Sequence, residues 1–174
     1  MKKIEIITPV YNEEKNIGKT IESFFSEYKD TDFDISFIIS EDGSTDNTKN
    51  ILSNLSKTYN LNIFTSKERK NYTDAVLYGL RKSSSDIISF VDSDGQYDPK
   101  DLKRLYENLQ KGQIVIGYRH PRVDNIFRLV VSNTFKKLYK FFLRIDLKDP
   151  SCGYFIAYRK EVIEIIENED VGYL

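Results

Sequence analysis

The sequence has few of the residues on which disulfide scaffolds and histidine-based sites depend. Its 174 residues include one cysteine and one histidine. Cys152 has no partner for a disulfide within the chain, which fits a reducing compartment, and we expect it to be a small buried apolar side chain. His120 alone cannot form an HExxH zinc site, and a Ser-His-Asp triad would depend on it entirely. Both hydrolase classes are therefore disfavoured.

Long apolar runs are also missing. No segment approaches the roughly 20 apolar residues that span a bilayer. The start, MKKIEIITPV, carries two lysines, but Glu5 and Pro9 interrupt its apolar stretch, which is too short for a signal peptide. We therefore expect a soluble, cytoplasmic protein.

The chain does have enough apolar material for a core, since 40% of its residues are hydrophobic and 13% aromatic. Its length suits a single domain over residues 1–174, because cores rarely exceed about 200 residues before chains divide. The charges balance, with 26 Lys+Arg against 27 Asp+Glu. No overall charge attracts nucleic acid, and we expect no such partner.

Short β-rich apolar runs alternate with longer segments of helical period, which predicts an α/β fold with a mostly parallel central sheet flanked by helices. The predicted strands are Ile4–Val10, Ile35–Ser40, Leu61–Thr65, Asp86–Asp92, Gln113–Tyr118 and Gly153–Tyr158. The predicted helices lie near Glu14–Tyr28, Asp46–Tyr59, Thr73–Lys82, Pro99–Lys111, Asn125–Leu143 and Lys160–Asn168. Right-handed crossovers would bring the carboxyl end of every strand to one edge, where α/β sheets bind ligands.

Three of these strands end in polar or acidic clusters. They are Thr8–Glu14 (TPVYNEE), Ser40–Asp46 (SEDGSTD) and Phe90–Gln96 (FVDSDGQ). The first has no glycine, which excludes a GxGxxG dinucleotide loop or a P-loop there. In the second, Gly43 permits the positive φ of a sharp turn, and the side-chain oxygens that follow can cap a helix. Each cluster alone is more often a turn or cap than a site, but three on one edge favour a site.

The third cluster carries two carboxylates two residues apart. On extended backbone, residues i and i+2 point the same way, so Asp92 and Asp94 can converge on one ion. A cation relieves their repulsion, and hard oxygen ligands favour Mg²⁺ or Mn²⁺. Such a metal usually completes its shell with water and substrate phosphates, which indicates a phosphorylated substrate. The alternative is a plain strand-to-helix loop over Asp92–Asp98 with a helix cap. In either case Pro99 is expected at the first position of the next helix.

In this order and spacing, TPVYNEEKNI, SEDGSTDNT and SFVDSDGQYDP resemble the nucleotide-sugar-binding half of family 2 glycosyltransferases. The resemblance runs from Lys3 to about Lys160, nearly the whole chain. It implies the GT-A fold, a Rossmann-like sandwich. It also implies an inverting, metal-dependent hexosyltransferase that uses a nucleoside-diphosphate sugar and Mg²⁺ or Mn²⁺.

The resemblance further implies roles for single residues. The nucleoside pocket would be lined by Pro9, Tyr11 and Glu13, with Asp42 hydrogen-bonded to the base. The catalytic pair would be Asp92, near the ribose and the metal, and Asp94, a ligand of the metal that bridges the diphosphate, with Gln96 assisting at the metal. These roles agree with the chemistry of the side chains, since a tyrosine ring can stack on a base and a divalent ion can neutralise a departing diphosphate.

The chain departs from the family pattern at two places. Glu41 stands where the family often has an aspartate, and its longer side chain changes what it can reach. The segment Glu68–Ala75 lacks the glycines usual before the helix. There, Asn71 could adopt the left-handed turn and Arg69 or Lys70 could meet phosphate, or the segment could be a solvated basic loop.

The second half is more similar to one branch of the family, the transferases that move a sugar onto a polyprenyl or dolichyl phosphate. We expect the acceptor phosphate to be bound by Arg119, at the end of a strand, and by Arg128 and Ser132, which share a helix face. The alternative is a surface arginine beside a helix serine. The basic and aromatic residues of the same helix suit a peripheral contact with anionic lipid on the inner membrane face, or equally a core helix with solvated lysines.

The chemistry of the acceptor favours the lipid phosphate. A phosphate monoester, with a second pKa of about 6, can attack without a protein base, whereas a sugar hydroxyl needs one. The late acid pair Glu169–Asp170 lies close to the end of the chain, where fraying is common. A saccharide hydroxyl stays the alternative acceptor. Outside enzymes, the alternatives are a Mg²⁺-binding receiver-like signalling module and a binder that holds nucleotide sugar without turnover.

The chain ends at Leu174, soon after its last predicted helix. Relatives usually continue with further acceptor-side structure and sometimes membrane segments, so a truncated chain is one interpretation. The sequence does not distinguish UDP from GDP, identify the sugar or indicate the oligomeric state.

Overall fold

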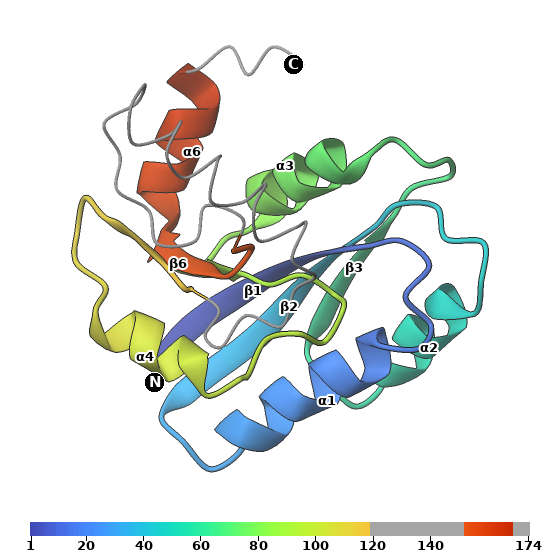
Figure 1. Ribbon diagram of the computed structural model, residues 1–174, viewed down its shortest axis with the longest axis horizontal. Helices are drawn as coiled ribbons and strands as arrows, with labels where there is room; N and C mark the ends of the chain where they lie inside the picture. Colours follow the sequence, from blue (N-terminus) through green and yellow to red (C-terminus); the bar gives the residue numbers. More distant parts are fainter. Residues whose placement is uncertain (119–151, 169–174) are drawn as a thin grey trace, which may run out of the picture.

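The computed structural model describes residues 1–118 and 152–168. These residues form a 6-stranded sheet in the order β3-β2-β1-β4-β6-β5, with helices on both faces (Figure 1). The strands are β1 (Lys2–Val10), β2 (Phe33–Glu41), β3 (Leu61–Thr65), β4 (Ile87–Phe90), β5 (Ile114–Ile116) and β6 (Phe155–Tyr158). The helices are α1 (Ile17–Tyr28), α2 (Thr48–Leu55), α3 (Tyr72–Lys82), α4 (Asp101–Glu107) and α6 (Arg159–Asn168).

The central strand β1 is parallel to both of its neighbours, β2 and β4. It is buried without a break from Ile4 to Val10, as expected for a strand that helices cover on both faces. Its carboxyl end lies level with those of its neighbours, since Val10 is in register with Glu41 and Ile7 with Phe90. The three polar clusters therefore leave the sheet at the same edge, as predicted.

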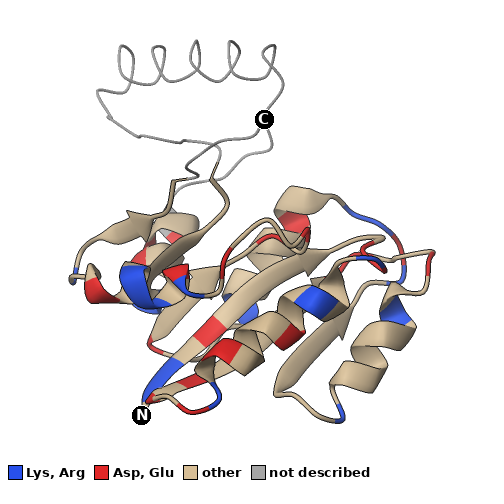
Figure 2. Cartoon of the chain, turned by 60° about the horizontal axis from the view of Figure 1, so that its bottom comes forward, with Lys and Arg blue, Asp and Glu red and all other residues tan. Residues whose placement is uncertain are grey.

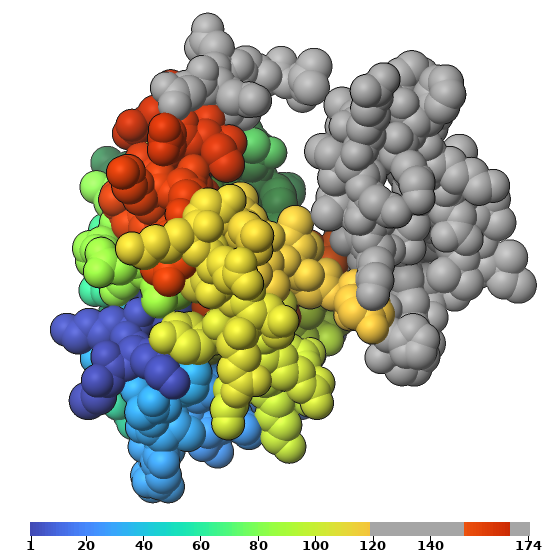
Figure 3. Space-filling view, turned by 90° about the vertical axis from the view of Figure 1, so that its left-hand side faces the viewer, coloured from blue at the N-terminus to red at the C-terminus, as the bar shows by residue number. Residues whose placement is uncertain are grey.

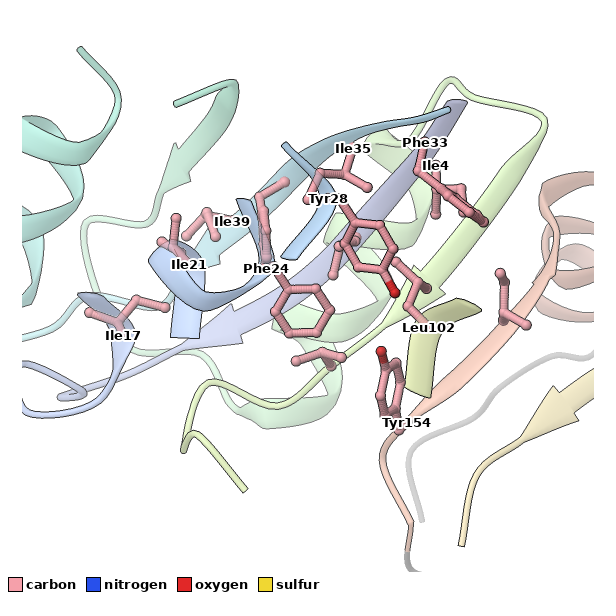
Figure 4. Close-up of a cluster of buried hydrophobic side chains, with 14 of the residues drawn as sticks. Ile4, Ile17, Ile21, Phe24, Tyr28, Phe33, Ile35, Ile39, Leu102 and Tyr154 are labelled. Atoms are coloured by element: carbon pink, nitrogen blue, oxygen red, sulfur yellow. The ribbon is translucent and has the colours of Figure 1, made fainter. Parts of the chain in front are cut away.

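The larger part of the core lies between the sheet and the helices α1, α2 and α4 (Figure 4). Helix α1 buries one stripe at helical spacing, made of Ile17, Ile21, Phe24 and Tyr28. The hydroxyls of Tyr28 and Tyr154 point toward each other in this core (Figure 4). Tyr28 donates to the carbonyl of Pro99 at 2.7 Å and accepts from the amide of Lys103 at 3.1 Å, which ties α1 to α4.

Helices α3 and α6 cover the other face of the sheet (Figure 1). Helix α3 lies close to the sheet at Gly79, where an added Cβ would come within 2.7 Å of both Ile7 Cγ2 and Ser40 Oγ. On the outer side, the amide of Gly112 donates to Glu161 Oε1 at 2.6 Å and joins the α4–β5 loop to α6. Figure 3 shows that loop and α6 on the same face of the molecule.

One strand runs against the prediction. The expectation that every strand ends at the same edge is wrong for β6, which is antiparallel to both β4 and β5. A short apolar strand does not encode its own direction, because its pattern reads the same in both senses. The reversal brings the start of β6, and Gly153 and Tyr154 just before it, to the edge where the polar clusters lie.

The helix boundaries are shorter than predicted at several ends. Helix α1 begins at Ile17 and not at Glu14, because the carbonyl of Glu13 accepts the amides of Asn16 and Ile17 in a preceding turn. Pro99 does not open α4, which begins two residues later at Asp101. The chain between them forms a turn in which the Asp101 amide donates to the carbonyl of Asp98 at 3.0 Å.

Several predictions lie outside the described residues. They are the helix Asn125–Leu143, the acceptor-phosphate residues Arg119, Arg128 and Ser132, and the acid pair Glu169–Asp170. Within residues 1–118 and 152–168, no helix is long and apolar enough to cross a membrane. Lys and Arg are interspersed with Asp and Glu over the visible elements, in line with the near-balanced composition (Figure 2).

Candidate functional site

The loop after β1 is fastened to the loop after β2. Asn12 adopts a left-handed conformation with φ of 55°, which asparagine tolerates better than most residues. Four backbone amides in the two loops are bound by side chains of the opposite loop: Asn12 by Ser44 Oγ (3.0 Å), Glu13 by Thr48 Oγ1 (2.9 Å), Thr45 by Asn12 Oδ1 (2.8 Å) and Asn47 by Glu14 Oε2 (2.9 Å). The two loops are therefore hydrogen-bonded into one rim at the end of the sheet.

The predicted turn at Gly43 is confirmed, since its φ is 76°. Gly43 must also lack a side chain because the segment between β3 and α3 lies against it. An added Cβ would lie 2.9 Å from the Arg69 nitrogen and the Glu68 carbonyl carbon. Only glycine satisfies both demands. The segment between β3 and α3 thus packs directly on the turn after β2.

That segment binds two of the predicted nucleoside residues. The amide of Lys70 donates to Asp42 Oδ1 at 2.8 Å, and Asp42 is only 5% exposed. The guanidinium carbon of Arg69 lies 4.1 Å from the centroid of the Tyr11 ring, which is cation–π geometry. The Arg69 side chain is thus in contact with Tyr11, whereas Lys70 makes its contact through the backbone amide, and both residues are exposed. Asn71 does not adopt the left-handed turn that was open to it, because its φ is 177°, and it caps α3 by accepting the Asp74 amide.

The two carboxylates after β4 lie on the same cavity. Tyr72 donates its hydroxyl to Asp92 Oδ1 at 2.7 Å, and Asp94 Oδ1 accepts the amide of Gln96 at 3.0 Å. The pKa of Tyr72 is raised, first because its hydroxyl is shielded from water and then because it donates to the Asp92 carboxylate. The phenol therefore stays protonated, and it is a hydrogen-bond donor at neutral pH.

The cavity has a volume of about 300 Å³ and brings together six of the predicted residues. Those six are Pro9, Tyr11, Glu13, Asp42, Asp92 and Asp94. Arg69, Tyr72 and Ser93 also contribute to its wall. A second hollow of about 810 Å³, between α3 and the ends of β2 and β3, shares Asp42 and Arg69 with the first, so the two adjoin.

Gln96 and Glu41 lie elsewhere. Gln96 is exposed and lines a separate hollow of about 740 Å³ beside α4 and β5, so its part at the metal stays a prediction. Glu41 is 2% exposed and faces its own turn, where Oε1 accepts the amide of Ser44 and Oε2 lies 3.9 Å from Lys49 Nζ. The longer acid at this position therefore braces the loop after β2.

Sequence reasoning missed Tyr72. No spacing rule links a residue at the start of α3 to a carboxylate 20 positions later, and the only signal was an aromatic beside a predicted helix start. It also missed Gly153, where an added Cβ would collide with Asp92 Oδ2. The antiparallel direction of β6 delivers this glycine to the site.

The residues present fit a divalent metal held in part by substrate. In the described part of the chain, no group of three or more His, Cys, Asp or Glu side chains is arranged to hold a metal. Two carboxylates on one cavity suit instead a hard cation whose remaining ligands are water and phosphate oxygens. Asp92 and Asp94 are the residues that would hold it.

Comparison with known proteins identifies the family. The model of the family "Glycosyl transferase family 2" matches residues 5–166, so the chain belongs to that family. Its sandwich is the GT-A fold, and the family and fold predicted from the sequence are both confirmed. Membership excludes the receiver-like signalling module.

Two curated relatives are named as polyprenyl-phosphate sugar transferases. One is the dolichol-phosphate mannosyltransferase of Pyrococcus furiosus, 29% identical over 98% of this chain and 50% of the relative. Another is the undecaprenyl-phosphate 4-deoxy-4-formamido-L-arabinose transferase of Photorhabdus laumondii, 26% identical over 94% of this chain and 51% of the relative. The chain thus spans about half the length of the curated relatives that it matches.

The solved structures support the fold. Glucosyl-3-phosphoglycerate synthase from Mycobacterium tuberculosis, in complex with Mn²⁺, UDP-glucose and phosphoglyceric acid, matches with a TM-score of 0.68 and 22% identity. The match covers 91% of this chain and 57% of the synthase. At this identity the likeness concerns the fold alone.

Proposed function

We propose that the protein is an inverting glycosyltransferase that moves a sugar from a nucleoside-diphosphate sugar to a polyprenyl phosphate at the cytoplasmic membrane surface. The observation that carries the proposal is the single cavity lined by Tyr11, Asp42, Asp92 and Asp94 in a member of family 2. The names of the curated relatives support a polyprenyl phosphate as acceptor.

The cavity residues divide the donor between them. The Tyr11 ring would stack on the base, and Asp42, oriented by the Lys70 amide, would accept a base N–H. Asp92 and Asp94 would hold Mg²⁺ or Mn²⁺, which supplies positive charge that neutralises the departing diphosphate. This assignment places the nucleoside against the rim of the first two loops and the diphosphate at the end of β4.

The transfer itself needs no protein base. An acceptor phosphate oxygen, already ionised at neutral pH, would form the new bond to the anomeric carbon from the face opposite the diphosphate. The bond from that carbon to the diphosphate oxygen would break, and the nucleoside diphosphate would leave with the electron pair. Arg119, Arg128 and Ser132, outside the described residues, are the predicted ligands of the acceptor phosphate.

The test is transfer of labelled sugar from a panel of UDP- and GDP-sugars to polyprenyl phosphate in detergent with Mn²⁺. Polyprenol, which lacks the phosphate, is the matched control acceptor, and EDTA removes the metal. We expect a labelled lipid only with the phosphate and only with metal. Transfer to saccharide acceptors in its place would contradict the lipid acceptor, and donor binding without turnover would indicate a non-catalytic binder.

A further inference from the structure

Tyr72, at the start of α3, lines the cavity that would bind the sugar donor. It is the first residue of that helix, whose cap is reciprocal: the Asp74 amide donates to Asn71 Oδ1 and Asn71 Nδ2 donates to Asp74 Oδ2, each at 2.8 Å. The residue as a whole is 56% exposed, yet its hydroxyl reaches inward to Asp92 Oδ1 at 2.7 Å. The helix start therefore aims one donor at one carboxylate oxygen.

A second element lies against the other oxygen of the same carboxylate. A Cβ at Gly153 would collide with Asp92 Oδ2 and lie 3.1 Å from its Cγ, so the backbone before β6 packs directly on the carboxylate. Gly153 is itself held there, because its amide donates to the hydroxyl of Tyr97 at 2.9 Å. Asp92 thus lies between the phenol of Tyr72 in α3 and the glycine backbone just before β6.

The chemistry of this partner suits a carboxylate that must still bind a cation. Lysine or arginine at the same place would orient Asp92 equally well, but its positive charge would neutralise the carboxylate and repel a metal. A phenol is a neutral donor, so it orients the group and leaves the negative charge in place. Hydrogen bonds of this kind to a metal-ligating carboxylate commonly set metal affinity.

We propose that Tyr72 is a positioning residue that holds the Asp92 carboxylate in the orientation in which Asp92 and Asp94 bind a divalent cation together with a nucleoside diphosphate. This inference rests on the proposed function and adds a residue to it. Tyr72 acts through Asp92, so its removal should weaken the metal more than the nucleotide.

The experiment is Tyr72→Phe, which deletes one oxygen and keeps the ring. Titration calorimetry with Mn²⁺ in the presence of saturating UDP, and separately of GDP, should show a loss of about tenfold in Mn²⁺ affinity. Nucleotide affinity without metal and the melting temperature should stay at the wild-type values. Raising the Mn²⁺ concentration should restore transfer, which a purely structural defect would not allow.

Tyr106→Phe is the matched control, because it removes the same group from α4, where the ring packs against Phe33 at the start of β2. It should bind Mn²⁺ as the wild type does. Gly153→Ala is the second variant, and by displacing Asp92 it should weaken Mn²⁺ binding at least as much as Tyr72→Phe.

Full Mn²⁺ affinity in Tyr72→Phe, with nucleotide bound, would overturn the inference alone. A wild-type protein that binds neither UDP nor GDP with Mn²⁺ would overturn the proposed function, and the inference with it.

Discussion

Carboxylates lie at both ends of the strands, at the edge of the sheet where the parallel strands begin and at the edge where they end, but their surroundings differ. At the edge where β1 and β4 begin, Glu5 is 5% exposed and accepts hydrogen bonds from the Ser84 hydroxyl and the Ser85 amide at 2.9 Å, and from the Ser84 amide. At the edge where β1, β2 and β4 end, Asp92 and Asp94 line a cavity of about 300 Å³. Glu5 is hydrogen-bonded within the fold, whereas Asp92 and Asp94 line a cavity that a ligand can fill.

The contrast shows that burial alone does not mark a functional acid. Three donors from one turn surround Glu5, so its charge is compensated inside the fold and fastens the turn before β4 to β1. The carboxylates after β4 each accept a hydrogen bond, Asp92 from the Tyr72 hydroxyl and Asp94 from the Gln96 amide, and they still lie on the cavity wall. A position on the wall of a common cavity, and not the degree of burial, distinguishes Asp92 and Asp94 from Glu5.

The largest effect is expected from an acid-to-amide change at the cavity edge. Asp94→Asn keeps an oxygen for the Gln96 amide but removes the negative charge, so metal-dependent sugar transfer should fall at least a thousandfold, about 4 kcal/mol in the barrier. Stability should change little, because the side chain is only partly buried. Transfer assays and urea unfolding measure the two effects. Wild-type activity in Asp94→Asn would show that Asp94 is not needed to bind the metal.

The same chemical change at the opposite edge should give the reverse result. Glu5→Gln turns an NH₂ group toward backbone donors, so unfolding free energy should fall by about 2 to 3 kcal/mol. Nucleotide affinity of the folded protein should stay the same. Urea unfolding and calorimetry test this, and a Glu5→Gln protein of normal stability with weakened nucleotide binding would break the comparison.

Alkaline pH should act on the core near the opposite edge. Burial raises the pKa of Tyr28 to about 12, despite the opposing hydrogen bond from the Lys103 amide, and nearby Glu27 adds to the rise. Because the folded-state pKa lies above the usual 10.0, ionisation of Tyr28 favours the unfolded state. Its contribution to the free energy of unfolding is therefore complete below pH 10 and is lost as pH rises through about 12.

The slope that Tyr28 contributes should reach about 1.1 kcal/mol per pH unit near the middle of that window. Urea unfolding at pH 9, 10 and 11 measures it. Tyr28→Phe, although less stable from the start, should show a shallower decline. An equal decline in both proteins would mean that another group is responsible.

The smallest effect is expected at the Tyr11 ring. Arg69→Ala removes the guanidinium that lies 4.1 Å from the ring centroid, and nucleotide affinity should fall about fivefold, or 1 kcal/mol. Arg69→Lys should recover part of it, since lysine is also a cation. An unchanged dissociation constant for UDP and GDP would show that the contact plays no part in donor binding.

Most of the cavity residues could be predicted because the carboxyl ends of parallel strands lie at the same edge of the sheet. Pro9, Asp42 and Asp92 follow different strands, yet register alone brings them to one cavity. The Gly43 turn was likewise predictable, since only its own φ was at issue. By contrast, the partner of Asp92 could not be found, because the distance between Tyr72 and the carboxylate depends on how α3 packs on the sheet.

The amino-acid sequence by itself determined the order of strands and helices, the family, and which polar clusters follow buried strands, because apolar period and local turn chemistry are properties of short segments. Tertiary structure alone decided the direction of β6, the placing of Gly153 and Tyr72 against Asp92, and the use of Glu5 as an internal support. These depend on contacts between residues far apart along the chain, whose geometry exists only when the helices have packed on the sheet.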